Sequence, residues 1–537
     1  MPSVGHKWAA GAGVNTETEA DTGGEAGAPA TVSTGPVADA GPASPDGDRT
    51  PGTGPGSDTP LEAVGRRALS GVLNLVVREA AIKALAFGGG IALARLLDPT
   101  AFGLFAVASF AVNLFALFSE LGLGAAFIRR RDEVSQHELR ALFTFQLVLV
   151  ALLAVVLFLL APLIAGIYSL PEAVWVIRAL AVSLVLTSLR SVPVVVAERN
   201  LRYGPIALAD VAGQAAYWLV AISAAFAGMG VWSLVWAVTA SGLVGTAVLY
   251  LRTGWGPSLS FDWRPVWHSM RFGLMYQSQT AASFVKDTMI PALGGLIYGS
   301  AAVGYLTWAH QLAALPLLLT HLVARVSYPA FARLQHDPRA FTEMVLASLR
   351  WTCRVSFPAF AVLIGLSPQI IEYIYGPKWF PALSSLYVLY INMVLGVGTG
   401  ILMAAVYSLG RAGTGLRIHA SWAAATWLIA LALAYAGMGF ESLAWAYAMG
   451  TAAALTALVL TLRDLIPVVP SLAEVVRVPT IVGAITAATL YVLAPFIVHN
   501  WWSLAVLALA GGLAGLAANV WQDRAGALAA VRSALRP

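Results

Sequence analysis

The chain has 537 residues, of which 58% are hydrophobic and only 11% are charged, and its mean hydropathy is +0.76. Because soluble domains carry roughly 25% charged residues, this composition excludes a cytosolic globular enzyme and indicates a protein that lies in a lipid bilayer. Its single cysteine, Cys353, excludes a disulfide framework and a cysteine-rich zinc or iron–sulfur site.

Residues 1–65 are predicted to form a disordered tail on the cytoplasmic side. The first 60 residues are rich in Gly, Pro, Ala and Thr and show no apolar periodicity. Such a segment buries too little apolar surface to offset the chain entropy lost on folding. The first strongly apolar run begins near residue 71 without a cleavage-type pattern before it, so a signal peptide is not expected.

Apolar runs fill the rest of the chain. A helix needs about 20 residues to cross the hydrocarbon of a bilayer, and backbone groups in lipid must be paired within the segment, which favours helices throughout. The pattern predicts fourteen membrane-spanning helices at 71–96, 102–126, 141–167, 173–196, 206–228, 231–251, 271–297, 301–328, 343–372, 380–409, 415–436, 441–462, 478–498 and 500–521. The expected fold class is an all-α integral membrane protein.

Loop charge predicts the orientation of these helices. Arginines gather before the first helix, after the last one and in the loops that follow even-numbered helices, whereas the opposite side carries little beyond Arg95 and Lys378. Positive residues favour the cytoplasmic side of a membrane. Both termini are therefore expected in the cytoplasm.

The turns on the outer side are very short. Four examples are Tyr168–Glu172, Gly228–Gly230, Tyr298–Ser300 and Gly437–Phe440. Such links leave no room for an external catalytic domain, which argues against membrane glycosyltransferases and polysaccharide polymerases.

The sequence also contains a weak internal repeat. Residues 97–106 (LDPTAFGLFA) overlay residues 298–307 (YGSAAVGYLT), and in both copies a short turn precedes a hydrophobe and a glycine. Six predicted helices separate the copies, so both halves have the same orientation, as in transporters whose substrate path lies between parallel repeats. This predicts a six-helix lobe at 66–255, a second six-helix lobe at 256–463, and two extra helices with a short tail at 464–537.

A few charges lie inside predicted helices. Lys83 and Lys286 fall near the middle of the membrane at corresponding places in the two repeats, and Arg78 lies about 7 Å toward the cytoplasm from Lys83. A charge at this depth costs at least about 2.5–3.5 kcal/mol and normally faces a water-filled cavity. We therefore predict that these cations line a vestibule that holds a phosphate or pyrophosphate, with Glu79 and Asp287 as candidates for binding a coupling proton or sodium ion.

Structural explanations compete with that reading. Lys83 has the spacing for an ion pair with Glu79 one helical turn away, and Asp287 is a potential counter-ion for Lys286, although adjacent side chains diverge on a helix. His310 and His321 share a helix face, which suits a proton relay but also ordinary hydrogen bonding between helices.

Known catalytic patterns are missing from the sequence. None of the four lysines follows a glycine, so there is no Walker A lysine, and His137-Glu138 has no second histidine three residues later. Neither an enzymatic activity nor a cofactor is predicted.

Several segments in fixed order carry a resemblance to a known family. The chain is similar to bacterial exporters of lipid-linked oligosaccharides, of the colanic-acid, teichuronic-acid and O-antigen type, which belong to the multidrug/oligosaccharidyl-lipid/polysaccharide exporter superfamily. The matching segments are RLLDPTAFGLFA (95–106), SELGLGAAFIRRRD (119–132), AERNLRYGPIALADV (197–211), GMGVWSLVWA (228–237), GLIYGSAAVGYLTWAHQLAALPL (295–317), YPAFARLQ (328–335) and IYGPKWFPA (374–382).

The resemblance implies a flippase that moves an undecaprenyl-pyrophosphate-linked oligosaccharide across the bacterial inner membrane by alternating access, for surface polysaccharide biosynthesis. Basic residues of the first and seventh helices tend to line the cavity in such proteins, which here implicates Arg78, Lys83 and Lys286. The implied partners are the lipid-linked glycan, membrane lipids, a polysaccharide polymerase and glycosyltransferases, with no nucleic acid.

Three alternatives remain open at this point. A cation-coupled drug antiporter of the same superfamily would use acidic rather than basic residues at mid-membrane. A membrane polymerase or ligase would need an external loop, and a scaffold of a polysaccharide-assembly complex would need no transport activity.

Overall fold

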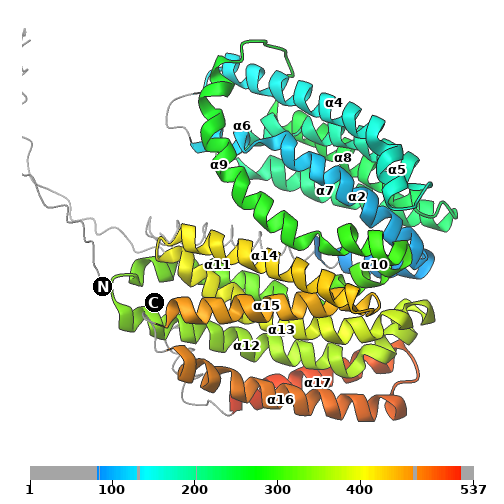
Figure 1. Cartoon of the computed structure of the whole chain (residues 1–537), viewed down its shortest axis with the longest axis vertical. Coiled ribbons are helices and arrows are strands. Elements are labelled where there is room, and N and C mark those ends of the chain that lie inside the picture. The colour runs from blue at the N-terminus through cyan, green and yellow to red at the C-terminus, as the bar shows by residue number, and fades with distance from the viewer. Residues whose placement is uncertain (1–81, 84, 130–133, 201, 464–467, 522–537) are drawn as a thin grey trace, which may run out of the picture. The chain divides into compact units, whose positions relative to one another are not determined.

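Every regular element is a helix in the part of the chain that the computed structural model describes, which is residues 82–83, 85–129, 134–200, 202–463 and 468–521 (Figure 1). Twelve of these helices are long and apolar enough to cross a membrane. The predicted all-α membrane fold is confirmed, but the count of fourteen is not. The predicted first helix, 71–96, lies partly outside the described residues. Within them, it corresponds to the short apolar helix Leu85–Leu96.

The first group of helices contains α2 to α8. Their bounds are α2 (Pro99–Glu120), α3 (Leu123–Arg129), α4 (Gln136–Ile167), α5 (Ala173–Ser188), α6 (Ser191–Arg199), α7 (Tyr203–Phe226) and α8 (Trp232–Thr253). An apolar core joins α2, α4 and α5, while α7 packs along α8. The predicted helix 102–126 is divided in two, because the backbone is left-handed at Leu121 (φ 44°) and Gly122 (φ 63°).

Local sequence explains why α4 begins before the predicted residue 141. Ser135 Oγ accepts a hydrogen bond from the Glu138 N–H at 3.2 Å, and Glu138 Oε2 accepts one from the Ser135 N–H at 2.9 Å. This capping box pairs two amide groups that the first turn would otherwise leave without partners.

The middle of the chain is less regular. It contains α9 (Arg264–Asp287), a π-helical turn (Ile290–Gly294), α10 (Gly295–Ala313) and α11 (Leu317–Leu334). Gly299 has a non-helical backbone (φ 80°, ψ 178°) within α10, so the predicted turn at Tyr298–Ser300 is present. The predicted helices 271–297 and 301–328 thus lie on either side of that turn, each interrupted once.

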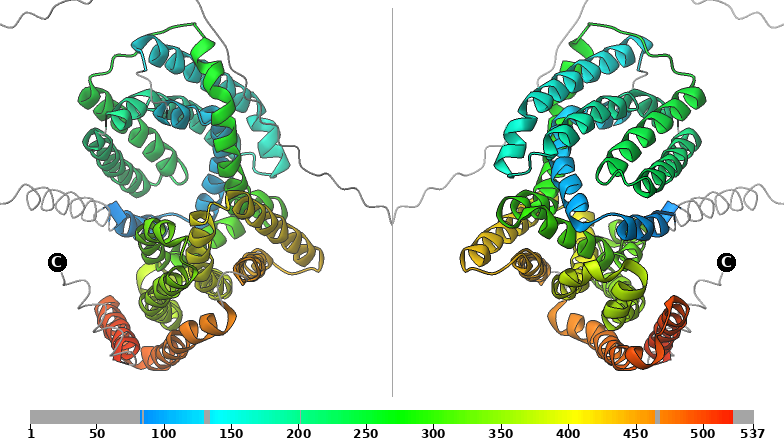
Figure 2. Two further views of the ribbon diagram at one scale, coloured as in Figure 1. Left: turned by 90° about the vertical axis from the view of Figure 1, so that its left-hand side faces the viewer. Right: turned by 90° about the vertical axis from the view of Figure 1, so that its right-hand side faces the viewer.

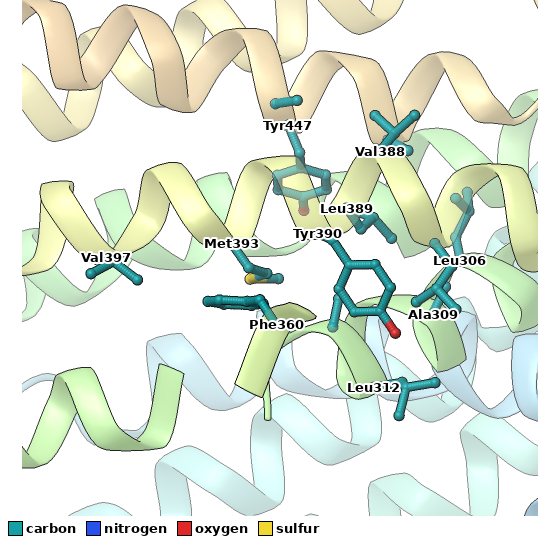
Figure 3. Close-up of a cluster of buried hydrophobic side chains, with 14 of the residues drawn as sticks. Leu306, Ala309, Leu312, Phe360, Val388, Leu389, Tyr390, Met393, Val397 and Tyr447 are labelled. Carbon is teal, nitrogen blue, oxygen red and sulfur yellow. The ribbon is translucent and has the colours of Figure 1, made fainter. Parts of the chain in front are cut away.

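The last group contains α12 (Pro338–Gln369), a π-helical turn (Ile370–Tyr375), a 3₁₀ turn (Pro377–Ala382), α13 (Leu383–Ser408), α14 (Ala412–Tyr435), α15 (Glu441–Leu462), α16 (Val468–Ile497) and α17 (Trp501–Trp521). Its core includes Phe360, Leu389, Tyr390 and Met393, which Figure 3 shows gathered around α13. Both views of Figure 2 place α16 and α17 together, and each of them packs on α12.

Helices α2 and α10 touch through two glycines that the repeat superposes. A Cβ atom added to Gly103 would lie 1.7 Å from the carbonyl oxygen of Ser300, and one added to Gly304 would lie 1.9 Å from the carbonyl oxygen of Pro99. In the alignment of 97–106 with 298–307, Gly103 corresponds to Gly304 and Pro99 to Ser300. The contact is therefore reciprocal, as expected at a two-fold axis between parallel repeats. The boundaries of the two six-helix lobes stay predictions.

Arg95 and Lys378, the two cations that do not follow the loop-charge pattern, donate hydrogen bonds to backbone carbonyl groups at helix ends. Lys378 Nζ donates to the carbonyl oxygens of Arg95 (2.9 Å) and Leu97 (2.7 Å) at the end of the helix Leu85–Leu96. The Arg95 guanidinium donates to the carbonyl oxygens of Tyr373 and Ile374, and the buried Trp379 donates through Nε1 to Ala94 at 2.9 Å. These bonds pair the carbonyl groups that a helix end leaves open.

We expect Lys378→Met to lower the free energy of unfolding by about 1–2 kcal/mol, because two carbonyl groups lose a charged donor while the apolar stem is kept. Thermal unfolding of the purified protein in detergent measures the change. Lys378→Arg, which keeps the charge and donors, is the control and should unfold close to the wild type. Equal unfolding temperatures for Lys378→Met and the wild type would contradict the capping role.

Candidate functional site

A cavity of about 730 Å³ lies among α9, α10, α11, α13, α14 and α15. We call it the Lys286 cavity. Its polar lining side chains are Ser283, Lys286, Asp287, His310, His321, Tyr328, Asn392, Thr399, Tyr407, His419, Trp422, Tyr447 and Thr451. Apolar residues such as Leu317 and Met403 complete the walls. Such a mixture suits a ligand that needs both hydrogen bonds and apolar contact.

Lys286 is the cation of this cavity. Its side chain is 17% exposed and forms an ion pair with the carboxylate of Asp287, which is 62% exposed. The Lys286 ammonium also lies 4.7 Å from the centre of the Trp422 ring, within the range of a cation–π interaction.

These adjacent side chains meet at the end of α9. Asp287 is the last residue of α9, and a π-helical turn follows at Ile290–Gly294. The potential counter-ion role of Asp287 is therefore confirmed: both residues lie in α9, and the long, flexible lysine side chain reaches the neighbouring carboxylate.

Two aromatic side chains fix this helix end. The Tyr447 hydroxyl is shared between the carbonyl oxygens of Lys286 (3.2 Å) and Asp287 (3.3 Å), and Trp427 Nε1 donates to Val285 at 2.9 Å. The Tyr447 ring also lies against His310, with 5.6 Å between ring centres. The position of Lys286 thus depends on α14 and α15, more than 130 residues away in sequence.

We expect Tyr447→Phe to lower the free energy of unfolding by about 1 kcal/mol, since a buried hydrogen bond is lost and the ring is kept. Tyr435→Phe is the matched control, because Tyr435 is 96% exposed at the end of α14 and should tolerate the same change. Thermal unfolding of both variants decides the matter. Identical stabilities would mean that the hydroxyl does not hold the end of α9.

Further hydrogen-bonding groups line the Lys286 cavity. Thr451 Oγ1 donates to Asn392 Oδ1 at 2.6 Å between α15 and α13, and Tyr407 contacts His419 Nδ1 at 3.3 Å. His310 and His321 line the same cavity, although the helix that was predicted to carry both is interrupted before Leu317.

Lys83 lies in a second cavity, of about 600 Å³, which Tyr217, Trp218 and Tyr375 also line. Its side chain is exposed. The two cavities share His310, Ala314 and Leu318. The two lysines thus line two adjoining cavities that share part of their walls, and the single vestibule stays a prediction.

The other predicted site residues, Arg78 and Glu79, lie outside the described residues. Roles in substrate binding for Arg78, Lys83 and Lys286, and in ion coupling for Glu79 and Asp287, stay predictions.

Sequence reasoning missed a third polar cavity, of about 520 Å³, among α2, α4 and α6. Arg190 lines it, pairs with Asp210 at 2.7 Å, and leaves its Nε buried without a hydrogen-bond partner among the described residues. From the sequence, Arg190 is one of the arginines at the edges of the predicted cytoplasmic loops. The signal that could have found the pair was an aspartate inside the predicted helix 206–228.

Comparisons with known proteins agree with this architecture. A family model described as "Polysaccharide biosynthesis protein" matches residues 92–384. The chain is 27% identical over 283 residues to the teichuronic acid biosynthesis protein TuaB of Bacillus subtilis, covering 52% of this chain and 58% of that protein. It is 25% identical over 324 residues to the lipopolysaccharide biosynthesis protein WzxC of Escherichia coli, covering 58% and 65%. The chain thus spans less than two thirds of the length of these relatives.

Solved structures share the fold. The lipid II flippase MurJ in an inward closed conformation superposes with a TM-score of 0.68 at 14% identity, over 84% of this chain and 99% of that one. An inward-facing multidrug transporter of the MATE family superposes with a TM-score of 0.53 at 16% identity, over 76% of this chain and 95% of that one.

Proposed function

Since the chain belongs to the polysaccharide biosynthesis protein family, we propose that this multi-pass membrane protein is a flippase that carries an undecaprenyl-pyrophosphate-linked oligosaccharide across the bacterial inner membrane. The observation that carries the proposal is the Lys286 cavity, where a lysine ammonium lies beside aromatic and hydrogen-bonding side chains. Both termini would face the cytoplasm. Glycosyltransferases would supply the lipid-linked glycan, and a polymerase would consume it.

The chemistry of the cavity suits such a head group. A pyrophosphate needs positive donors in a space with little water, and Lys286 offers an ammonium there. The Trp422 ring and the side chains of Asn392 and Tyr407 offer an apolar face and hydrogen bonds for sugar rings. The polyprenyl tail would stay in the surrounding lipid.

The ion pair provides a means of coupling. A phosphate that binds Lys286 must compete with Asp287, whose largely exposed carboxylate is free to turn to water. A proton or sodium ion on Asp287 would release the ammonium for the phosphate, so binding of the ion and of the substrate would favour one another. No resident cofactor is proposed.

In alternating access, the two repeats would pivot about the contact between α2 and α10. Its reciprocal glycine contacts allow two backbones to meet closely, and a two-fold axis there would relate the rocking of one repeat to that of the other.

A cation-coupled drug antiporter is the second candidate, because Asp287 and Trp422 would suit a cationic aromatic substrate equally well. Reconstitution in liposomes separates the two. We expect translocation of undecaprenyl-pyrophosphate-linked glycans and no efflux of cationic dyes. Dye efflux without glycan translocation would favour the antiporter, and neither activity in a well-folded preparation would favour a scaffold.

A further inference from the structure

A small cavity of about 220 Å³ lies where α12, α16 and α17 meet, separate from the three cavities above. It is lined by Arg350 and Arg354 of α12, Glu474 of α16 and Asn519 of α17, together with three apolar residues of α16. We call it the Asn519 cavity. None of its residues lines the Lys286 cavity.

Asn519 is the unusual member of this group. Its side chain is 1% exposed, yet neither Nδ2 nor Oδ1 has a hydrogen-bond partner among the described residues. Native proteins pair nearly all such atoms, and an apolar residue of the same size would avoid the cost. The amide is therefore left to pair with a water molecule or with a ligand that accepts a hydrogen bond from Nδ2 and donates one to Oδ1.

The surrounding charges define the sign of that ligand. Among the described residues, two guanidinium groups and one carboxylate line the cavity, an excess of one positive charge. Arg354 lies 5.5 Å from the Trp351 ring centre, and Arg350 is exposed at the rim. A single negative charge balances the site, as a phosphodiester provides.

The depth of the cavity points to lipid. Glu474 lies at the start of the apolar span Ala473–Ile497, and Asn519 lies two residues before the end of the span Trp501–Trp521. Both are therefore at one boundary of the hydrocarbon, where phospholipid phosphates lie. Beside Asn519, Val520 and Trp521 are 43% and 65% exposed, as expected for side chains against lipid at such a boundary.

We propose that the Asn519 cavity binds the head group of an anionic glycerophospholipid that carries one phosphodiester and a hydroxyl group, as phosphatidylglycerol does. The phosphate oxygens accept hydrogen bonds from Asn519 Nδ2 and the arginines, and a head-group hydroxyl donates to Asn519 Oδ1. A bound lipid of this kind joins α12 to α16 and α17 and stabilises their packing. The site does not depend on the proposed substrate.

The test uses the full-length protein, stripped of lipid in detergent and titrated with phosphatidylglycerol, phosphatidylethanolamine or soluble glycerol 3-phosphate. The shift in unfolding temperature gives an apparent affinity. The variants are Asn519→Leu and Arg350→Gln. Arg477→Gln is the control, because Arg477 is an exposed arginine of α16 that does not line the cavity.

We expect phosphatidylglycerol to raise the unfolding temperature of the wild type and of Arg477→Gln, and its apparent affinity to fall about tenfold or more in the other two variants. Without lipid, Asn519→Leu should unfold no earlier than the wild type, since it removes two unpaired buried atoms. Equal responses of all variants, or of the wild type to both lipids, would overturn the proposal. A response to glycerol 3-phosphate equal to that of the lipid would overturn the lipid as the source of the phosphate.

Discussion

Gly103→Ala is expected to destabilise the protein by about 3 kcal/mol or more, the largest effect of any single methyl group that we foresee. The added Cβ would lie 1.7 Å from the carbonyl oxygen of Ser300. A backbone oxygen has no rotamer by which to move away, so α2 and α10 would have to separate. Membrane abundance and thermal unfolding in detergent both report the loss.

The reciprocal contact sharpens this experiment. Gly304→Ala should cost a similar amount, and the double variant should cost clearly less than the sum, because one separation of the helices relieves both clashes. Gly166→Ala in α4 is the control: nothing lies within 4 Å of its added Cβ, and alanine favours a helix over glycine by about 0.5–1 kcal/mol. Additive losses would show that the two glycines do not share one contact.

Lys286→Met is expected to reduce glycan export about 10- to 100-fold while leaving the amount of protein in the membrane unchanged. A hydrogen bond between charged groups contributes about 1.5–3 kcal/mol, which corresponds to that range. Folding should be spared, because methionine keeps an unbranched apolar side chain in place of the lysine stem and the partner Asp287 is 62% exposed to solvent. Export in cells, normalised to protein abundance, is the measurement.

Two further variants define the cavity responsible. Lys83→Met removes the cation of the neighbouring cavity and should have the smaller effect, since Lys83 is exposed. Lys286→Arg keeps the charge and should retain part of the export. Full export by Lys286→Met would exclude the Lys286 cavity as the binding site.

Apolar runs predicted most of the helices, because crossing a bilayer sets their length. The helix 441–462 has the predicted bounds, and all four predicted short turns are present. The interruptions after α2 and after α10 were not predictable from hydropathy. One of them, at Gly122, lies where the chain meets Gly273 of α9, a contact between residues far apart in sequence.

Arginine counting predicted orientation but could not explain its own exceptions. Arg95 donates a hydrogen bond to a backbone carbonyl group near Lys378, and Lys378 donates one to the carbonyl group of Arg95. Charge counts treat every loop cation as a topological signal, and a capping role becomes visible only when both segments are in place.

The site was predictable in part. The sequence singled out Lys286, which lines a cavity in the structure, whereas its depth in the membrane and its role in binding stay predictions. The sequence did not predict Tyr447 and Trp422, which reach α9 from distant helices, or that Lys83 and Lys286 would line two adjoining cavities. Likewise, nothing in the local sequence distinguishes Asn519 from an ordinary residue at a helix end.

Binding of undecaprenyl pyrophosphate to the purified protein tests the central claim most directly. Native mass spectrometry across a titration gives the affinity for wild type, Lys286→Met and Lys83→Met. The account predicts that Lys286→Met binds at least about tenfold more weakly than the wild type, with a smaller change for Lys83→Met. Equal affinity of the wild type and Lys286→Met would contradict it.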